Sequence, residues 1–357
     1  MLHFLFRFGL LKFNMSQITI VDLAETLGLS KSTVSRAFRD SNDISAKTKA
    51  RILAKAEELG FSPNLYASSL RGNRSQTIAI IIPEFGNKFF SQAIKGIELV
   101  ARSKKYHTLI YVTDHNVKNE ASIVRSLVNG RVDGVLISAS GEGKDHSHLQ
   151  ALVDHNIPTV FFDRSYDDFR GHFVTGNDFE SSRLATQHLI DNGCKRIAYL
   201  VINQNVSIGK IRMDGYKRAL EDNRIAFQEE LVLDTENDET ENKAAIRNLI
   251  RTYRPDGIFA SVERLAISAI RVAQEENLKI PDDLKLICFS CLDITDLLNP
   301  SLSVVKQPAF DMGKQAANFL FQSLDKPTEM VEQQTTLLES SLIFQDSSQR
   351  IRISKKN

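Results

Sequence analysis

The segment KSTVSR at residues 31–36 combines basic and small hydroxyl side chains in a pattern that suits contact with nucleic acid. In a helix, its apolar side chains lie on one face and its polar side chains lie on the opposite, exposed face. An arginine there can form a bidentate pair with guanine, hydroxyl groups reach bases and phosphates without bulk, and a helix N-terminus attracts phosphate. The exposed candidates are Lys31, Ser32, Ser35 and Arg36. The alternative, a generic helical mini-domain, has no need of such a face, so the pattern favours binding in a DNA major groove.

Three short helices are predicted to position this face. Thr19, Ser30 and Ser45 are suitable N-caps, and Gly28 and Gly60 are suitable helix ends. The expected helices, each with apolar residues at helical spacing, span residues 20–27, 31–38 and 46–59. A helix, a tight turn that contains glycine and a second helix form the spacing of a helix-turn-helix. The sequence therefore predicts a small helical head with one shared apolar core.

Charge is distributed unevenly along the 357 residues. Residues 1–76 contain 11 Lys and Arg against 6 Asp and Glu, whereas the rest of the chain contains 34 against 38. A basic segment on a mildly acidic body indicates a head that binds a polyanion and a body with another task. The length suggests two to three domains, and 42% hydrophobic with 25% charged residues excludes a disordered, collagen-like or coiled-coil chain.

The sequence contains no feature that indicates export or a membrane span. No run approaches the roughly 18 apolar residues that cross a bilayer. The apolar residues 1–14 lead into the first helix without a cleavage site, so we expect a non-native extension with Met15 as the natural first residue, or else a disordered or interfacial tail. Three cysteines in a chain of this length fit a reducing compartment, and we expect a cytoplasmic protein.

From Thr77 onward, short Val/Ile/Leu runs alternate with amphipathic helices, which is typical of doubly wound parallel sheets. An Arg-x-Asp-Gly run occurs at residues 131–134 and again at residues 254–257. Each run is preceded by a helix that contains a glycine, Gly96 in the first case and Gly215 in the second. The repeat predicts two α/β lobes of related topology, with a ligand cleft between them beyond the carboxyl ends of the strands.

The chain resembles the lac repressor family of bacterial transcription regulators, also called LacI/GalR. The resemblance is carried in the head by TIVDLAETLGLSKSTVSRAF and ISAKTKARILAKAEELGFSPNLYASSLR. It continues in IAIIIPEFGNKFFSQAIKGIE, GNDFESSRLATQHLIDNGCKRIAYL, RMDGYKRAL and SVVKQPAFDMGKQAANFL, and it covers about residues 17–346. It implies an all-α helix-turn-helix head followed by a two-lobed α/β body, similar to periplasmic binding proteins, with two doubly wound parallel sheets.

By this resemblance Lys31, Ser32 and Arg36 read bases, whereas Thr33 and Ser35 hold phosphates. Residues 63–70 resemble the hinge helix of the family, which folds on the operator. Leu70 matches a leucine wedged between central base pairs in the minor groove, and an apolar wedge of this kind kinks DNA; packing of Leu70 on the body is the alternative. The DNA-binding residues expected on these grounds are Thr19, Lys31, Ser32, Thr33, Ser35, Arg36, Asn64, Tyr66, Ala67 and Leu70.

The resemblance also implies a small-molecule effector in the cleft between the lobes. Phe90 matches a position that lines the pocket, although simple helix packing is its alternative role. Asp163 matches an acceptor for sugar hydroxyls, and Arg212 matches an arginine whose planar fork binds effector oxygens. The effector-binding residues expected are Phe89, Phe90, Asp163, Arg164, Arg212, Glu263 and Ser290.

One wall of the expected cleft departs from the family pattern. Val262-Glu263 stands where Asn-Asp is common, and the segment CFSC at residues 288–291 stands where Gly-Phe-Asp-Asp is common. The missing carboxylate and amide acceptors would have offset the free-energy cost of burying sugar hydroxyl groups. We therefore expect a phosphorylated or otherwise anionic sugar, held by Arg212 with Arg164 and Ser290, rather than a free monosaccharide. An unusual ligand, or control by a protein partner without a ligand, is the alternative.

Two further pairs have spacings that occur in metal or redox sites. Cys288 and Cys291 lie at a strand end without further ligands, so we interpret them as buried cysteines. His146 and His148 lack a third ligand, so we interpret the loop GEGKDHSH as solvated. No metal and no cofactor are expected. The sequence contains no P-loop, H-E-x-x-H or G-x-S-x-G motif, and an enzyme is not expected.

We therefore predict a transcription regulator, and more narrowly a repressor, that binds a palindromic operator as a homodimer under the control of a small carbohydrate-like effector. The expected parts are an extension at 1–14, a head at 15–61, a hinge and linker at 62–76, a body at 77–346 and a tail at 347–357. Lobe 1 is expected at about 77–175 and 303–337, and lobe 2 at about 176–302 and 338–346. The alternatives are a solute-binding protein without DNA reading, which would need export, and a sugar-modifying enzyme, which would need acid–base residues.

Overall fold

A computed structural model describes residues 18–38, 43–61, 74–142, 145–166, 169, 171–235, 238–325 and 334–349. The chain divides into two compact units, one that ends at Asn73 and one that begins at Arg74. No helix among these described residues is long and apolar enough to cross a membrane.

The described residues of the first unit form three short helices, as the sequence predicts. They are α1 (Ile20–Leu27), α2 (Lys31–Phe38) and α3 (Ala46–Glu58). Thr19 begins α1 in a capping box, and Gly28 ends it with a left-handed backbone at φ 64°. Leu23, Val34 and Ile52, one from each helix, are fully buried in a shared core. Burial of Val34 fixes the rotation of α2, so that its polar residues lie toward solvent.

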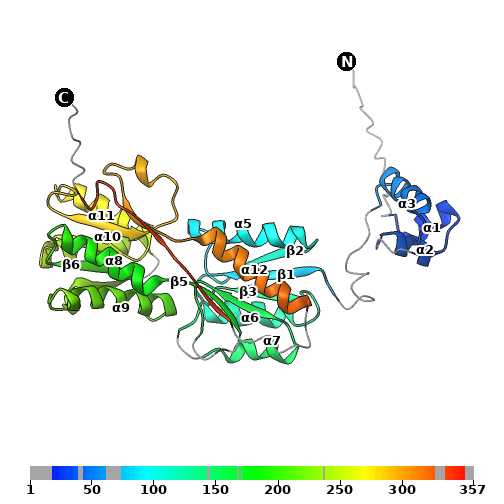
Figure 1. Cartoon of the computed structure of the whole chain (residues 1–357), viewed down its shortest axis with the longest axis horizontal. Helices are drawn as coiled ribbons and strands as arrows, with labels where there is room; N and C mark the ends of the chain where they lie inside the picture. Colours follow the sequence, from blue (N-terminus) through cyan, green and yellow to red (C-terminus); the bar gives the residue numbers. More distant parts are fainter. Residues whose placement is uncertain are drawn as a thin grey trace, which may run out of the picture. The chain divides into compact units, whose positions relative to one another are not determined.

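The second unit contains two six-stranded sheets, one in each lobe (Figure 1). Lobe 1 has the strand order β11-β5-β4-β3-β1-β2, and lobe 2 has the order β12-β10-β9-β8-β6-β7. All neighbouring strands are parallel except β10 and β12. The strands are β1 (Thr77–Ile82), β2 (His107–Val112), β3 (Gly134–Ile137), β4 (Thr159–Phe162), β5 (His172–Gly176), β6 (Ile197–Ile202), β7 (Val232–Thr235), β8 (Gly257–Ala260), β9 (Lys285–Phe289), β10 (Ser303–Lys306), β11 (Thr335–Leu338) and β12 (Ser341–Ile343). This confirms the predicted pair of parallel sheets, except that β12 pairs antiparallel to β10.

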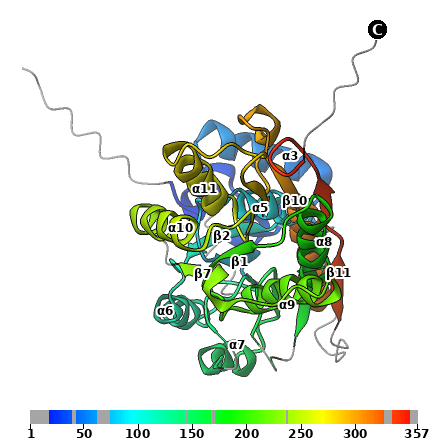
Figure 2. The ribbon, with the colours of Figure 1, turned by 90° about the vertical axis from the view of Figure 1, so that its left-hand side faces the viewer.

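Helices cover both faces of each sheet. In lobe 1, α5 (Lys88–Ser103) and α12 (Ala309–Asp325) pack on one face, and α6 (Val117–Leu127) and α7 (Gln150–Asp154) pack on the other. In lobe 2, α10 (Glu239–Tyr253) and α11 (Glu263–Glu275) lie on one side, and α8 (Asp178–Asp191) and α9 (Ser207–Asp222) on the other (Figure 2). The strands are therefore apolar on both faces, which explains the continuous Val/Ile/Leu runs of the sequence.

The repeated Arg-x-Asp-Gly run has the same structural role in both lobes. Asp133 accepts hydrogen bonds from the backbone N–H groups of Ser75 and Gln76, immediately before β1, at 2.6 and 2.9 Å. Asp256 accepts from the backbone N–H groups of Lys195 and Arg196, immediately before β6, at 2.9 and 2.8 Å. Each aspartate thus fixes the entry of the chain into the first strand of its lobe.

Within the described ranges the chain crosses between the lobes three times, and one crossing lies later than expected. β5, in lobe 1, leads to α8 in lobe 2, and β11 in lobe 1 leads to β12 in lobe 2. β10 was expected in lobe 1, but Val304 and Val305 of this strand pair with β9 in lobe 2, so this crossing follows Lys306. Lobe 2 also extends beyond residue 346, because Ser347 is buried and its hydroxyl donates to the carbonyl of Leu286 at 2.7 Å.

Both lobes contain a close helix crossing at a glycine. A Cβ atom on Gly96 of α5 would collide with the backbone carbonyl oxygen of Phe310 in α12. A Cβ atom on Gly215 of α9 would collide with the backbone carbonyl oxygen of Phe179 in α8. The two glycines noted in the sequence therefore allow equivalent helices to approach each other in the two lobes.

Replacing Gly96 with alanine should lower the free energy of unfolding of the body by about 1–3 kcal/mol, because the added methyl group forces two helices apart. Gly86→Ala is a matched control, since a Cβ atom there would have no neighbour within 4 Å. Urea unfolding monitored by circular dichroism measures both variants. Equal stability of the two would contradict the close crossing.

Candidate functional site

The polar face of α2 carries the candidate DNA contacts in the first unit. Lys31, Ser32 and Arg36 are exposed, whereas Thr33 and Ser35 are half-buried. The Ser30 hydroxyl accepts the backbone N–H of Thr33 at 3.1 Å, so Ser30 caps α2 as expected. The Arg36 side chain is 48% exposed. Among the described residues its Nη1 lies 4.0 Å from Asp43 Oδ2, and its Nε donates to the carbonyl oxygen of Ser32 at 3.4 Å. The exposed end of the guanidinium can therefore reach a base edge.

The remaining DNA-binding candidates fall in two places. Thr19 is exposed at the N-cap of α1, where its hydroxyl contacts the carboxylate of Asp22 at 2.8 Å. The hinge candidates, Asn64, Tyr66, Ala67 and Leu70, lie outside the described residues.

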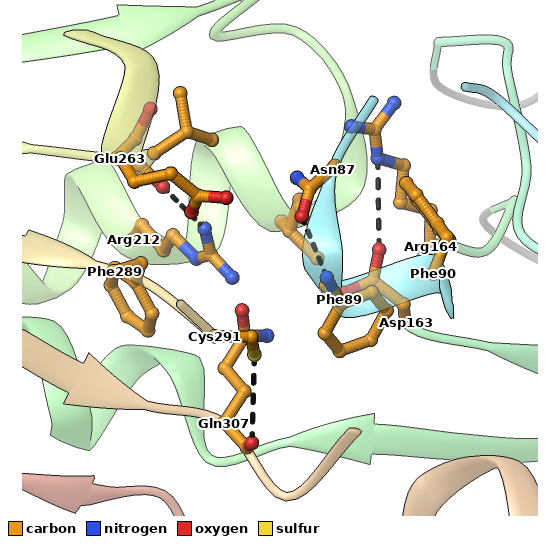
Figure 3. Close-up of a pocket in the computed structure, with 13 residues that line it drawn as sticks. Asn87, Phe89, Phe90, Asp163, Arg164, Arg212, Glu263, Phe289, Cys291 and Gln307 are labelled. Carbon is orange, nitrogen blue, oxygen red and sulfur yellow. Dashed lines mark hydrogen bonds and ion pairs between the residues drawn. The ribbon is translucent and has the colours of Figure 1, made fainter. Parts of the chain in front are cut away.

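A pocket lies in the second unit where strand ends of both lobes meet (Figure 3). The space between its side chains is about 340 Å³, part of it open to solvent. Its lining residues are Asn87, Phe89, Phe90, Asp163, Arg164, Ile208, Arg212, Ser261, Val262, Glu263, Phe289, Cys291 and Gln307. Most follow the carboxyl end of a parallel strand, which is where ligands bind in open α/β sheets.

Six of the seven predicted effector residues line this pocket, and Ser290 does not. The Ser290 backbone N–H donates to the carbonyl oxygen of Val305 at 3.1 Å, and the Ser290 hydroxyl accepts the backbone N–H of Leu292 at 3.1 Å. Side chains alternate along an extended segment, so Phe289 and Cys291 face the pocket and Ser290 points away from it. Ser290 is therefore not placed to hold an effector.

Arg212 is held rigidly in the lobe 2 wall of the pocket. Its Nε donates to Asp178 Oδ1 at 2.6 Å, its Nη1 donates to the carbonyl of Ser261 at 2.8 Å, and its guanidinium lies 3.7 Å from the ring centre of Phe289. Burial would lower the pKa of Arg212, but Asp178 and Asp163 outweigh burial and raise it. The group is a permanent cation whose remaining N–H groups can point into the pocket.

Asp163 provides a strained, buried carboxyl in the lobe 1 wall. Its backbone is left-handed at φ 64°, an uncommon conformation for a residue other than glycine. Burial raises its pKa to about 6, although Arg164 and Arg212 act in the opposite direction. Glu263 lies across the pocket, and burial raises its pKa as well. Both carboxyls have lost hydration that a ligand's hydroxyl groups could replace.

The Asp163→Asn variant should unfold at a higher temperature than the wild type at pH 7.5. Because the pKa of Asp163 is raised from 3.8 to about 6 by folding, its contribution to stability is complete below about pH 4 and is lost as the pH rises through 6. Asparagine cannot ionise and tolerates the left-handed backbone. Differential scanning calorimetry from pH 7.5 to pH 4 should show the advantage of the variant shrinking.

Asp154→Asn, at an exposed carboxylate of the same lobe, serves as the control for the loss of one carboxylate. An Asp163→Asn variant that is less stable than the wild type at pH 7.5 would show that ion pairing outweighs burial at this position.

Sequence reasoning missed seven lining residues, namely Asn87, Ile208, Ser261, Val262, Phe289, Cys291 and Gln307. Asn87 had a usable signal, since it caps α5 by accepting the backbone N–H of Phe89 at 2.9 Å. Gln307 had none, because it lies in the lobe crossing that follows β10. Its buried side-chain nitrogen has no hydrogen-bond partner among the described residues, so a ligand could accept from it.

Polar contacts join the lobes around the pocket. They are Arg264 Nη1 to Glu84 Oε2 at 2.9 Å, Lys88 Nζ to Asp293 Oδ2 at 3.4 Å, Asn203 Nδ2 to Glu142 Oε1 at 2.8 Å, and the backbone N–H of Ser165 to Ser207 Oγ at 3.2 Å. The lobes are therefore held together partly by side chains that a change of lobe angle would separate.

The cysteine and histidine pairs have structural roles. Cys288 is buried in the lobe 2 core, and burial raises the pKa of Cys291 to about 12, so neither is a reactive thiolate. The interpretation of GEGKDHSH as a solvated loop is wrong for His148, whose Nε2 lies 2.7 Å from Glu120 Oε1 in a buried contact. No cluster of metal-binding side chains occurs within the ranges that the structure describes.

A helix-turn-helix head with an exposed basic helix, in one chain with a two-lobed body that holds a polar pocket, defines a DNA-binding transcription regulator with an effector domain. Models of two families match the chain: "Bacterial regulatory proteins, lacI family" over residues 19–64, and "Periplasmic binding protein-like domain" over residues 186–348. The ribose operon repressor of Halalkalibacterium halodurans is 30% identical over 330 residues, which cover 89% of this chain and 97% of the relative. The chain belongs to the lacI family of bacterial regulatory proteins.

Other relatives agree with this assignment. The repressor PurR of Vibrio campbellii is 28% identical, with coverage of 87% of this chain and 93% of the relative. The fold matches the lac repressor dimer bound to operator and the anti-inducer ONPF, with a TM-score of 0.81 and 22% identity. The match covers 93% of this chain and 99% of the lac repressor chain. It also matches a LacI family regulator from Enterococcus faecium with bound ribose, with a TM-score of 0.67 and 24% identity. This match covers 76% of this chain and 98% of that regulator's chain. Both of the relatives named above are repressors, and the chain is a transcription regulator rather than an enzyme.

Proposed function

We propose that the chain is a repressor that binds a palindromic operator as a homodimer and responds to a small polar effector in the pocket between its lobes. Two helix-turn-helix heads in a dimer read half-sites about one helical turn apart, and twofold symmetry in the protein requires a palindromic site. The similar lac repressor was solved as a dimer on its operator, which supports the same assembly here. Action on chromosomal DNA implies a cytoplasmic location.

The observation that carries the effector proposal is the convergence of charged side chains from both lobes on one space. Asp163 and Arg164 come from lobe 1, and Arg212 and Glu263 come from lobe 2 (Figure 3). A molecule held by both sets stabilises one arrangement of the lobes over others. Movement between lobes is an established way for a ligand to change a distant interface.

The charges in this pocket favour a neutral effector rich in hydroxyl groups, such as a monosaccharide. Two carboxyls, Asp163 and Glu263, accompany two guanidiniums, and that of Arg212 is already paired with Asp178. Ser290, expected to help hold an anionic group, does not line the pocket, and its hydroxyl accepts the backbone N–H of Leu292. Hydroxyl groups can both donate to carboxylates and accept from guanidiniums, whereas a phosphate can only accept from the arginines. The relative named as a ribose operon repressor, and the regulator solved with ribose, support a neutral sugar.

Thermal unfolding of the full chain with D-ribose, D-glucose or D-ribose 5-phosphate tests this proposal. A neutral sugar at about 100 times its Kd should stabilise the folded state by about 2.7 kcal/mol. The Asp163→Asn variant should lose that shift, and Asp154→Asn should keep it. A response to the phosphorylated sugar alone would contradict the neutral ligand. No response to any sugar from a chain that still binds its operator would favour control by a protein partner.

A further inference from the structure

His115 stands between the effector pocket and an ion pair that joins the lobes. It lies in the loop after β2, in lobe 1. Its Nδ1 lies 3.2 Å from Nη1 of Arg164, which lines the pocket. Its Nε2 lies 3.7 Å from Oε2 of Glu84, the same oxygen that accepts Nη1 of Arg264 from lobe 2 at 2.9 Å. The four side chains thus form a row from the pocket to the opposite lobe.

Hydrogen-bond chemistry fixes the protonation of this histidine. A guanidinium has only donors, so Nδ1 of His115 has to accept from Arg164. The ring is then neutral and carries its proton on Nε2, which faces the Glu84 carboxylate. Protonation of Nδ1 would place an N–H group against the guanidinium and break the row at Arg164.

The carboxylate in the row is strongly held in its charged form. Burial would raise the pKa of Glu84, but the N–H group of His115 and the guanidinium of Arg264 outweigh burial and lower it. Arg164 also lies 3.8 Å from Asp163, so the charged groups around His115 are Glu84 and Arg164 in lobe 1, Asp163 beyond them, and Arg264 in lobe 2.

Two observations indicate that the row has a role beyond packing. The backbone of His115 is left-handed at φ 57°, and strained residues of this kind concentrate at functional positions. Glu84 Oε1, His115 Nε2 and Arg164 Nε are buried without a hydrogen-bond partner among the described residues. The row therefore has unused hydrogen-bonding capacity, and a small rotation of the Glu84 side chain could convert its 3.7 Å contact with His115 into a hydrogen bond.

We propose that His115 is a positioning residue that couples Arg164 in the effector pocket to the Glu84–Arg264 pair between the lobes. Its neutral ring orients the Arg164 guanidinium through Nδ1 and presents its Nε2–H group to the Glu84 carboxylate 3.7 Å away. The effector part rests on the proposed function, because it requires a ligand that Arg164 contacts. The coupling itself exists in the free protein.

Nitrogen NMR of the full chain with ¹⁵N-labelled histidine tests the coupling without an effector. His115, assigned by its loss in His115→Gln, should show the Nε2–H form near neutral pH. Its resonances should shift in both Arg164→Gln and Arg264→Gln, although Arg264 does not touch the ring. His155 is a control, because its Nδ1 lies 2.8 Å from the carbonyl of Ala151 and should carry the proton. A protonated His115, a proton on Nδ1, or no response to Arg264→Gln would overturn the proposal.

Calorimetric titration with D-ribose tests the consequence for ligand binding. His115→Phe should weaken binding about tenfold, within the usual range for coupled sites. His115→Gln, which keeps an acceptor and a donor, should stay within about threefold of the wild type, and a purely steric role would not produce this rescue. Adding Arg264→Gln to His115→Phe should weaken D-ribose binding little further, because the row is already broken. If the two changes weakened binding by fully additive amounts, the coupling would be contradicted. If D-ribose does not bind the wild type, the proposed sugar effector fails, while the NMR result still decides the role of His115.

Discussion

Replacing Arg212 with methionine should destabilise the body by about 3–5 kcal/mol, because the change leaves the buried carboxylate of Asp178 without a partner. Arg212 and Asp178 are 4% and 3% exposed and lie 2.6 Å apart. The variant would also lose the carbonyl contact to Ser261 and the stacking on Phe289. Guanidinium chloride unfolding monitored by circular dichroism measures the loss.

Two matched variants separate pairing from packing. The double variant Arg212→Met/Asp178→Asn should recover most of the stability, because it removes both charges, but it should not regain effector binding. Arg218→Met, on the same helix, removes a half-exposed arginine paired with Glu221 and Asp222, and should cost less than about 1 kcal/mol. An Arg212→Met variant as stable as Arg218→Met would show that the buried pair is not formed.

The second large effect is expected at the DNA-binding face. Arg36→Ala should weaken binding to a selected operator duplex by about 10- to 100-fold, because a bidentate arginine–guanine contact is worth about 1–3 kcal/mol. Binding to unrelated DNA should weaken much less, since that binding depends on phosphate contacts. Fluorescence anisotropy with labelled duplexes measures both affinities.

Lys55→Ala is the control for the loss of positive charge in the head. Lys55 lies on α3, where it pairs with Glu58 at 2.6 Å, and it is not on the polar face of α2. The Lys55→Ala variant should reduce specific and non-specific DNA binding slightly and by the same factor. If Arg36→Ala and Lys55→Ala behaved alike on the selected duplex, Arg36 would act only through charge and not by reading a base.

The head was predictable because its signals are local. Caps, glycine ends and apolar spacing lie within a few residues of each other, so Thr19, Gly28 and Ser30 indicated helix ends that the structure confirms. The two lobes were predictable because the Arg-x-Asp-Gly run itself recurs in the sequence. The contacts that Asp133 and Asp256 make with the segment before a first strand span 58 and 60 residues, and the sequence did not indicate them.

The pocket was predictable only in part, because its geometry depends on contacts between distant residues. Whether Ser290 or its neighbours face the pocket depends on the exact extended register after β9. Gln307 enters the pocket because β10 pairs with β9, which no local pattern indicated. Glu84 and Arg264 are 180 residues apart, and His148 is bound to Glu120, 28 residues away. Composition and residue spacing do not predict contacts between side chains this far apart in the sequence.

The most direct test of sequence-specific repression is an anisotropy titration of the full chain against two duplexes at two salt concentrations. One duplex is a palindrome enriched from a pool with random half-sites, and the other is its scrambled version. We expect the palindrome to bind at least about 10³-fold more tightly, with two chains on each duplex, and to keep its preference as salt rises. Equal affinities for both duplexes that fall together with salt would mean that the head binds only phosphate, and would contradict the proposed operator reading.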